Sequence, residues 1–80
     1  MAPTALRAYG HGMKLSARNQ LTGTVTEIRQ GEAIANVVLD VAGQRLVASI
    51  TVEAADELGL KPGAEVTAVI KASDIIVMTD

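Results

Sequence analysis

The stretch AIANVVLDVAGQRLVASITV, residues 33–52, decides the fold of this 80-residue chain. Apolar residues recur in both of its halves with the two-residue period of a β-strand. The two faces of the first half carry Ala33, Ala35, Val37, Leu39 and Val41, and Ile34, Asn36, Val38 and Asp40, respectively. The second half places Leu46, Ala48, Ile50 and Val52 on one face. Because Ala42-Gly43-Gln44 separates the halves as a short turn, the stretch predicts an antiparallel hairpin.

Further signals extend this pattern in both directions. Residues 21–28 alternate as a first strand, and a turn at residues 30–32 follows it. The two faces of that strand carry Leu21, Gly23 and Val25, and Thr24, Thr26 and Ile28. Residues 53–60, EAADELGL, predict a short helix that begins with acidic residues and ends at Gly59. After a Pro62-Gly63 turn, residues 66–71 and 75–78 predict a fourth and a fifth strand.

The order of these elements predicts an all-β fold. Three strands, a short helix between the third and fourth strands, and two further strands match the five-stranded OB-like Greek-key barrel. Other small β folds could also be drawn through the same elements. The first twelve residues, MAPTALRAYGHG, show no period, so we expect a flexible N-terminal leader at 1–12 and one domain at 13–80.

The composition excludes several classes of function. The net charge is −2 and no run of Lys or Arg is present, which argues against nucleic acid as a partner. No apolar run approaches the roughly 20 residues of a membrane span, so we expect a cytoplasmic protein without membrane contact. The single histidine, His11, lies in the expected leader, and cysteine is absent. The chain is therefore not expected to be an enzyme, to hold a metal cation or to carry a cofactor.

Two short, polar, cationic segments lie at strand ends. The stretch Lys14-Leu15-Ser16-Ala17-Arg18-Asn19-Gln20, with Ser16-Ala17-Arg18-Asn19 at its centre, precedes the first strand, and Lys71-Ala72-Ser73-Asp74 follows the fourth. A tetrahedral oxyanion needs guanidinium, ammonium, hydroxyl and backbone amide donors, and these segments offer each type. Each residue alone also fits a surface ion pair or a local turn hydrogen bond.

Three stretches together carry a family resemblance: MKLSARNQLTGTV at 13–25, ITVEAADELGLKPG at 50–63, and EVTAVIKASDIIV at 65–77. They resemble the Mop domain of molbindins, the small bacterial molybdate-binding proteins, and the resemblance covers residues 13–78. It implies an OB-like barrel that binds molybdate or tungstate in intracellular molybdenum storage, buffering or homeostasis. The oxyanion ligands implied by the resemblance are Ser16, Ala17, Arg18, Thr51, Lys71, Ala72 and Ser73, with Asn19 ordering the first loop.

The same resemblance implies a homo-oligomer, a hexamer built as a trimer of dimers with anion sites at its interfaces. Val37, Val38 and Leu39 in succession support assembly, because we expect them to expose apolar groups that a barrel this small cannot cover. One departure from the family concerns Ala54, where a related domain has a serine three residues after the threonine. One side-chain donor is therefore expected to be missing.

Two alternatives come from other classes of function. Residues 60–77, LKPGAEVTAVIKASDIIV, also resemble the strand-turn-strand of DNA-binding swapped-hairpin regulators, although the negative charge disfavours that function. The second alternative is an oligomerisation module without a physiological ligand.

Overall fold

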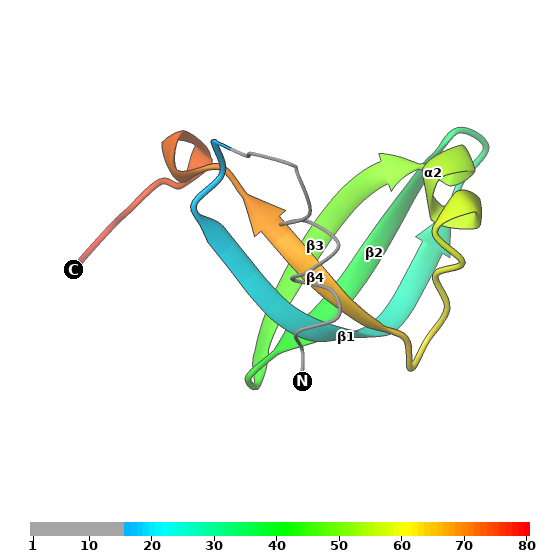
Figure 1. Cartoon of the computed structure of the whole chain (residues 1–80), viewed down its shortest axis with the longest axis horizontal. Helices are drawn as coiled ribbons and strands as arrows, with labels where there is room; N and C mark the ends of the chain where they lie inside the picture. Colours follow the sequence, from blue (N-terminus) through cyan, green and yellow to red (C-terminus); the bar gives the residue numbers. More distant parts are fainter. Residues whose placement is uncertain (1–15) are drawn as a thin grey trace. The chain divides into compact units, whose positions relative to one another are not determined.

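A computed structural model describes residues 16–80 of the chain. Within that range it contains four strands, one short α-helix and one 3-10 turn (Figure 1). In chain order these are β1 (Asn19–Gln30), β2 (Ile34–Val41), β3 (Gln44–Thr51), α2 (Val52–Glu57), β4 (Glu65–Ile70) and η1 (Ala72–Asp74). The expected leader at 1–12, His11 within it, and the expected domain start at residue 13 lie outside the described residues.

The four strands form one sheet in the order β3-β2-β1-β4, with β2 antiparallel to both β1 and β3. The predicted all-β class and the short helix between the third and fourth strands are thereby confirmed. The predicted fifth strand at residues 75–78 is wrong for the single chain. A strand requires a neighbour whose N–H and C=O groups complete its ladder, and in the described chain β4 ends in η1 without such a pairing.

The chain divides into two compact units. One comprises residues 22–66, and the other, here called the terminal unit, combines the described part of residues 1–21 with residues 67–80. Among residues 16–80, the buried apolar residues all belong to the 22–66 unit: Val25, Ala35, Val37, Val38, Leu39 and Ala55. A core of such small side chains supplies only modest stability, so contacts with other chains would add substantially to it.

A two-residue loop, the shortest that is common in β-hairpins, joins β2 and β3. Val41 pairs with Gln44, and the two residues between them, Ala42 and Gly43, both have positive φ angles of 51° and 86°. This is the type I′ arrangement, whose twist matches that of the flanking strands. The first position normally holds Asn, Asp or Gly, because the Cβ of alanine crowds the backbone in the left-handed region.

We therefore expect Ala42→Asn to stabilise the protein by about 0.5–1 kcal/mol, since asparagine tolerates this conformation better than alanine. A thermal melt followed by circular dichroism should show a midpoint a few degrees higher. Ser49→Asn, at an exposed position within β3, is the control and should give no such gain. A midpoint for Ala42→Asn at or below that of the wild type would contradict this account of the loop.

A β-bulge interrupts the alternation of β1. Val25 pairs with Leu39 and Glu27 with Val38, so Thr26 has no partner of its own in the β2 register. The hydroxyl of Thr26 donates to the carbonyl oxygen of Val38 at 3.2 Å. Strict alternation predicted Ile28 on the face opposite Val25, and this is wrong, because the extra residue returns Ile28 to the face of Val25.

The middle of β2 is apolar on both faces, as predicted, but it is not exposed. Val37, Val38 and Leu39 retain 2%, 7% and 4% of their accessible surface within a single chain. Val38 lies between Glu27 of β1 and Val47 of β3 on the face opposite Val37. The expectation that this segment needs another subunit to cover it is therefore wrong.

Helix α2 is short because both of its ends are specified locally. The hydroxyl of Thr51 accepts a hydrogen bond from the Ala54 amide at 3.0 Å and caps the N-terminus. At the other end the Gly59 amide donates to Asp56 O and the Leu60 amide to Ala55 O, the pair of bonds that defines a Schellman motif. Gly59 has a φ of 66°, so the predicted role of this glycine as the helix stop is confirmed.

Candidate functional site

The terminal unit contains most of the predicted oxyanion ligands. Seven of the eight belong to it, namely Ser16, Ala17, Arg18, Asn19, Lys71, Ala72 and Ser73. Thr51 belongs to the 22–66 unit. Two segments separated by about fifty residues of sequence therefore meet in one compact unit.

One hydrogen bond joins the two segments directly. The side-chain amide of Asn19, the first residue of β1, donates to the carbonyl oxygen of Ile70, the last residue of β4, at 3.2 Å. Asn19 and Ile70 are both half-buried, which protects this bond from competition by water. The bond fixes the spacing between Arg18 and Lys71 at the level of the backbone, because each cation is the direct neighbour of one bonded residue.

The second segment forms a single 3-10 turn. Lys71 precedes η1 with an extended backbone, and its carbonyl oxygen accepts from the Asp74 amide at 2.9 Å. The first N–H groups of a helical turn have no acceptor inside that turn. In η1 these are the amides of Ala72 and Ser73, which precede the amide of Asp74. The turn thus offers two backbone donors beside the ammonium group of Lys71 and the hydroxyl of Ser73.

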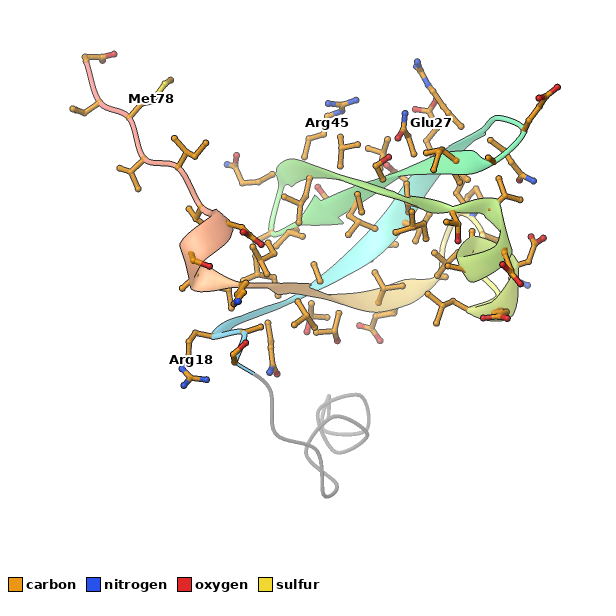
Figure 2. All side chains as sticks on the ribbon, turned by 90° about the horizontal axis from the view of Figure 1, so that it is seen from above. Arg18, Glu27, Arg45 and Met78 are labelled. Atoms are coloured by element: carbon orange, nitrogen blue, oxygen red, sulfur yellow. The ribbon has the colours of Figure 1, made fainter. Side chains whose placement is uncertain are left out.

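The charged side chains of these segments face solvent. Arg18 and Lys71 are both exposed, and Figure 2 shows the Arg18 side chain extending from the start of β1, on the same side of the unit as η1. Figure 1 likewise places the start of β1 beside η1. Guanidinium and ammonium groups donate charge-assisted hydrogen bonds to anions, which are about twice as strong as neutral ones. The terminal unit therefore presents a cationic, donor-rich edge, with Asp74 as a nearby carboxylate.

Thr51 has a structural role of its own as the N-cap of α2. It borders a depression of about 590 Å³ in the 22–66 unit. That depression is lined by Glu32, Ala33, Thr51, Val52, Glu53, Asp56 and Glu57. Four carboxylates repel an anion, so this depression cannot bind one unless cations approach it from outside the 22–66 unit. The hydroxyl of Thr51 accepts from Ala54, and its hydrogen is still available to a further acceptor.

The perturbed titrating pair in the described residues involves none of the predicted ligands. Arg29 donates to the carboxylate of Glu27 at 2.7 Å, and both side chains are largely exposed. This hydrogen bond, with the charge of Arg29, lowers the pKa of Glu27 from its ordinary value. Any stabilisation from the pair is thus lost only as the pH falls through that lowered pKa.

Two features are absent from residues 16–80. No three His, Asp or Glu side chains in that range are grouped so that they could hold a metal ion. None of the helices there is long and apolar enough to cross a membrane.

Ile70 is the residue that sequence reasoning missed. Its carbonyl oxygen fixes Asn19, yet an isoleucine at a strand end carries no polar signal, and a backbone acceptor cannot be read from residue type. Its position directly before Lys71 is the one sequence feature that could have identified it.

Comparisons with known proteins agree with this architecture. The family model of the TOBE domain matches residues 15–77. Molybdenum-pterin-binding protein 1 of Clostridium pasteurianum is 46% identical over 67 residues, which cover 82% of this chain and 98% of that protein. Both predicted ligand segments fall within the family match.

Solved structures give the same result at the level of the fold. A molybdate-binding protein from Sporomusa ovata superposes with a TM-score of 0.80 at 45% identity, covering 84% of this chain and 100% of that chain. The cytoplasmic molybdate-binding protein ModG, solved with molybdate bound, superposes with a TM-score of 0.76 at 51% identity. That match covers 84% of this chain and 48% of the ModG chain. The four-stranded sheet with one short helix is thus an arrangement of molybdate-binding proteins.

Proposed function

This chain belongs to the TOBE domain family, as a relative of the molybdenum-pterin-binding proteins, and we propose that it binds molybdate. The observation that carries the proposal is the hydrogen bond from Asn19 to Ile70, which holds the two cationic segments together. Tungstate, with the same charge and nearly the same size, is a ligand of the same site. The protein acts as a binding protein in cytoplasmic molybdenum storage, buffering or homeostasis, and it catalyses no reaction.

The proposed ligands divide by chemistry. Arg18 and Lys71 supply charge, Ser16 and Ser73 supply hydroxyl groups, and the amides of Ala17, Ala72 and Ser73 supply backbone donors. Asn19 positions the first segment. Thr51, set among carboxylates, donates its hydroxyl hydrogen to the oxyanion where copies of the chain meet in a homo-oligomer. The family resemblance supports a hexamer as that oligomer.

A bare oxyanion is favoured over a molybdenum–pterin compound. Residues 10–80 contain no Phe, Tyr or Trp, so the chain there offers no aromatic ring on which a pterin could stack. Charged and polar donors, by contrast, are present on both segments of the terminal unit.

The DNA-binding alternative required two strands joined by a turn in residues 60–77. The structure has one strand there, β4, followed by the 3-10 turn η1. The negative net charge also disfavours the phosphate backbone of DNA.

Isothermal titration of the full chain with molybdate, tungstate and sulfate tests the proposal. We expect saturable heat with molybdate and tungstate, and a melting temperature that rises with ligand concentration, because a ligand of the folded state stabilises it by mass action. Absence of both heat and thermal shift at millimolar molybdate would instead leave an oligomerisation module without this ligand.

A further inference from the structure

One acidic residue lies among the proposed donors of the candidate site. Asp74 is the last residue of η1, and it directly follows three of the proposed ligands, Lys71, Ala72 and Ser73. A carboxylate repels an oxyanion, so this residue opposes the binding that its three neighbours favour. Seven of the nine acidic residues of the chain belong instead to the 22–66 unit. Asp74 differs from those seven in lying directly beside anion-binding donors.

The backbone of the turn fixes the position of Asp74 relative to those donors. The Asp74 amide donates to the carbonyl oxygen of Lys71 at 2.9 Å, which closes η1. The next amide, that of Ile75, donates to the carbonyl oxygen of Ala72 at 3.3 Å. One turn of a 3-10 helix rises only about 6 Å. An anion held by the first amides of η1 therefore lies within about one Debye length, roughly 10 Å at 0.1 M salt, of the Asp74 carboxylate.

No close cation cancels the charge of Asp74 in the part of the chain that the structure describes. The carboxylate is exposed, and within residues 16–80 it forms no ion pair, although Lys71 precedes it by one turn. Its negative charge therefore acts on an incoming anion together with the opposite charges of Arg18 and Lys71. Because the group is exposed, water and salt screen the repulsion, which makes it moderate rather than prohibitive.

Given the proposed binding of molybdate, on which this inference rests, we propose that the Asp74 carboxylate limits the affinity of the oxyanion site so that a bound anion can be released. Arg18 and Lys71 together carry the two positive charges that balance a dianion, and Asp74 offsets one of them. A buffering protein must exchange its ligand with solution. A site with two cations and no opposing charge would bind the dianion more tightly and release it more slowly.

Isothermal titration of the full chain with molybdate, at about 0.1 M sodium chloride, tests this role. Asp74→Asn removes the charge and keeps the shape of the side chain, and we expect it to bind molybdate about threefold to tenfold more tightly than the wild type. Asp74→Ser, a second neutral replacement, should give a gain of the same order, so a folding defect of one variant does not decide the result. Asp74→Glu keeps the charge and should stay within about twofold of the wild-type affinity.

Asp40→Asn is the matched control, because it removes an exposed carboxylate from the 22–66 unit and changes the net charge by the same amount. Its affinity for molybdate should differ from that of the wild type by less than about twofold. Unchanged or weaker binding by both neutral variants of Asp74 would overturn the proposal. An equal gain for Asp40→Asn would also overturn it, because net charge rather than the position of Asp74 would then limit the affinity.

Salt distinguishes charge repulsion from a change in the shape of the turn. At about 1 M sodium chloride the Debye length is about 3 Å, so the gain of Asp74→Asn over the wild type should fall below about twofold. A gain that persists undiminished would refute the proposal, since altered donor geometry does not depend on screening. Equal binding by the wild type and Asp74→Asn would leave the proposed function intact and refute the role of Asp74. Absence of molybdate binding in the wild type and in every variant would end the proposed function, and this inference with it.

Discussion

Replacing Arg18 or Lys71 with alanine is expected to weaken molybdate binding tenfold to a hundredfold in each case. Charge-assisted hydrogen bonds contribute about 1.5–3 kcal/mol apiece, and 1.4 kcal/mol corresponds to a factor of ten in affinity. The folded state should be little affected, because Arg18 is exposed and the side chain of Lys71 makes no capping hydrogen bond. Isothermal titration measures the affinity, and circular dichroism checks that the variants are folded.

Arg45→Ala and Lys61→Ala are the matched controls, since they remove exposed cations of the same two types from the 22–66 unit. They should change the affinity less than about twofold, the effect of net charge alone at moderate salt. If Arg18→Ala and Lys71→Ala both keep wild-type affinity, the assignment of the two cationic segments as the site is wrong. If all four variants lose affinity equally, net charge rather than a defined site attracts the anion.

Gly23→Ala is expected to destabilise the protein by about 2–3 kcal/mol, the largest stability effect predicted for a single methyl group here. A Cβ at this buried position would lie 2.8 Å from the carbonyl oxygen of Asp40 and 2.8 Å from a methyl carbon of Val41. The oxygen belongs to the backbone of β2, so it cannot move without disturbing the β1–β2 pairing. A thermal melt should show a midpoint lower by about 10 °C or more.

Gly31→Ala provides a graded comparison. Its Cβ would also meet a backbone carbonyl oxygen, that of Ile34, but at 3.3 Å and in the exposed turn between β1 and β2. A shift of a few tenths of an ångström relieves that contact, so we expect a loss below about 1 kcal/mol. Equal melting midpoints for Gly23→Ala and Gly31→Ala would contradict this account, in which the absence of a Cβ at Gly23 allows β1 to pack closely against β2.

Local signals were sufficient for much of this fold. Alternation predicted β2, β3 and β4 to within a residue or two of their ends, because a half-buried strand imposes its two-residue period on the sequence. The Ala42-Gly43 turn and the Gly59 helix stop were identified because positive φ angles favour particular residue types within a few positions. The cationic segments at 16–19 and 71–73 were likewise visible from residue type and position.

The register between strands, and the burial that follows from it, could not be predicted from these local signals. The bulge at Thr26 exists only in the register against β2, and it moved Ile28 to the other face of the sheet. Val38 proved buried because Glu27 and Val47 lie on either side of it, a relation between three strands. No single segment contains the information on which its neighbours will lie, so alternation alone could predict neither result.

The candidate site shows the same division between sequence and tertiary structure. Residue types and the family resemblance indicated the donors, because oxyanion chemistry restricts which side chains can serve. The hydrogen bond from Asn19 to Ile70 joins residues 51 apart in sequence, and only the folded chain brings them together. Residues 75–78 are of strand-forming types, but a strand also needs a neighbouring edge, so the sequence predicted a strand that the single chain does not form. Sequence by itself thus determined the elements and the donor chemistry, while tertiary structure decided which elements pair, because pairing depends on contacts between segments far apart in the chain.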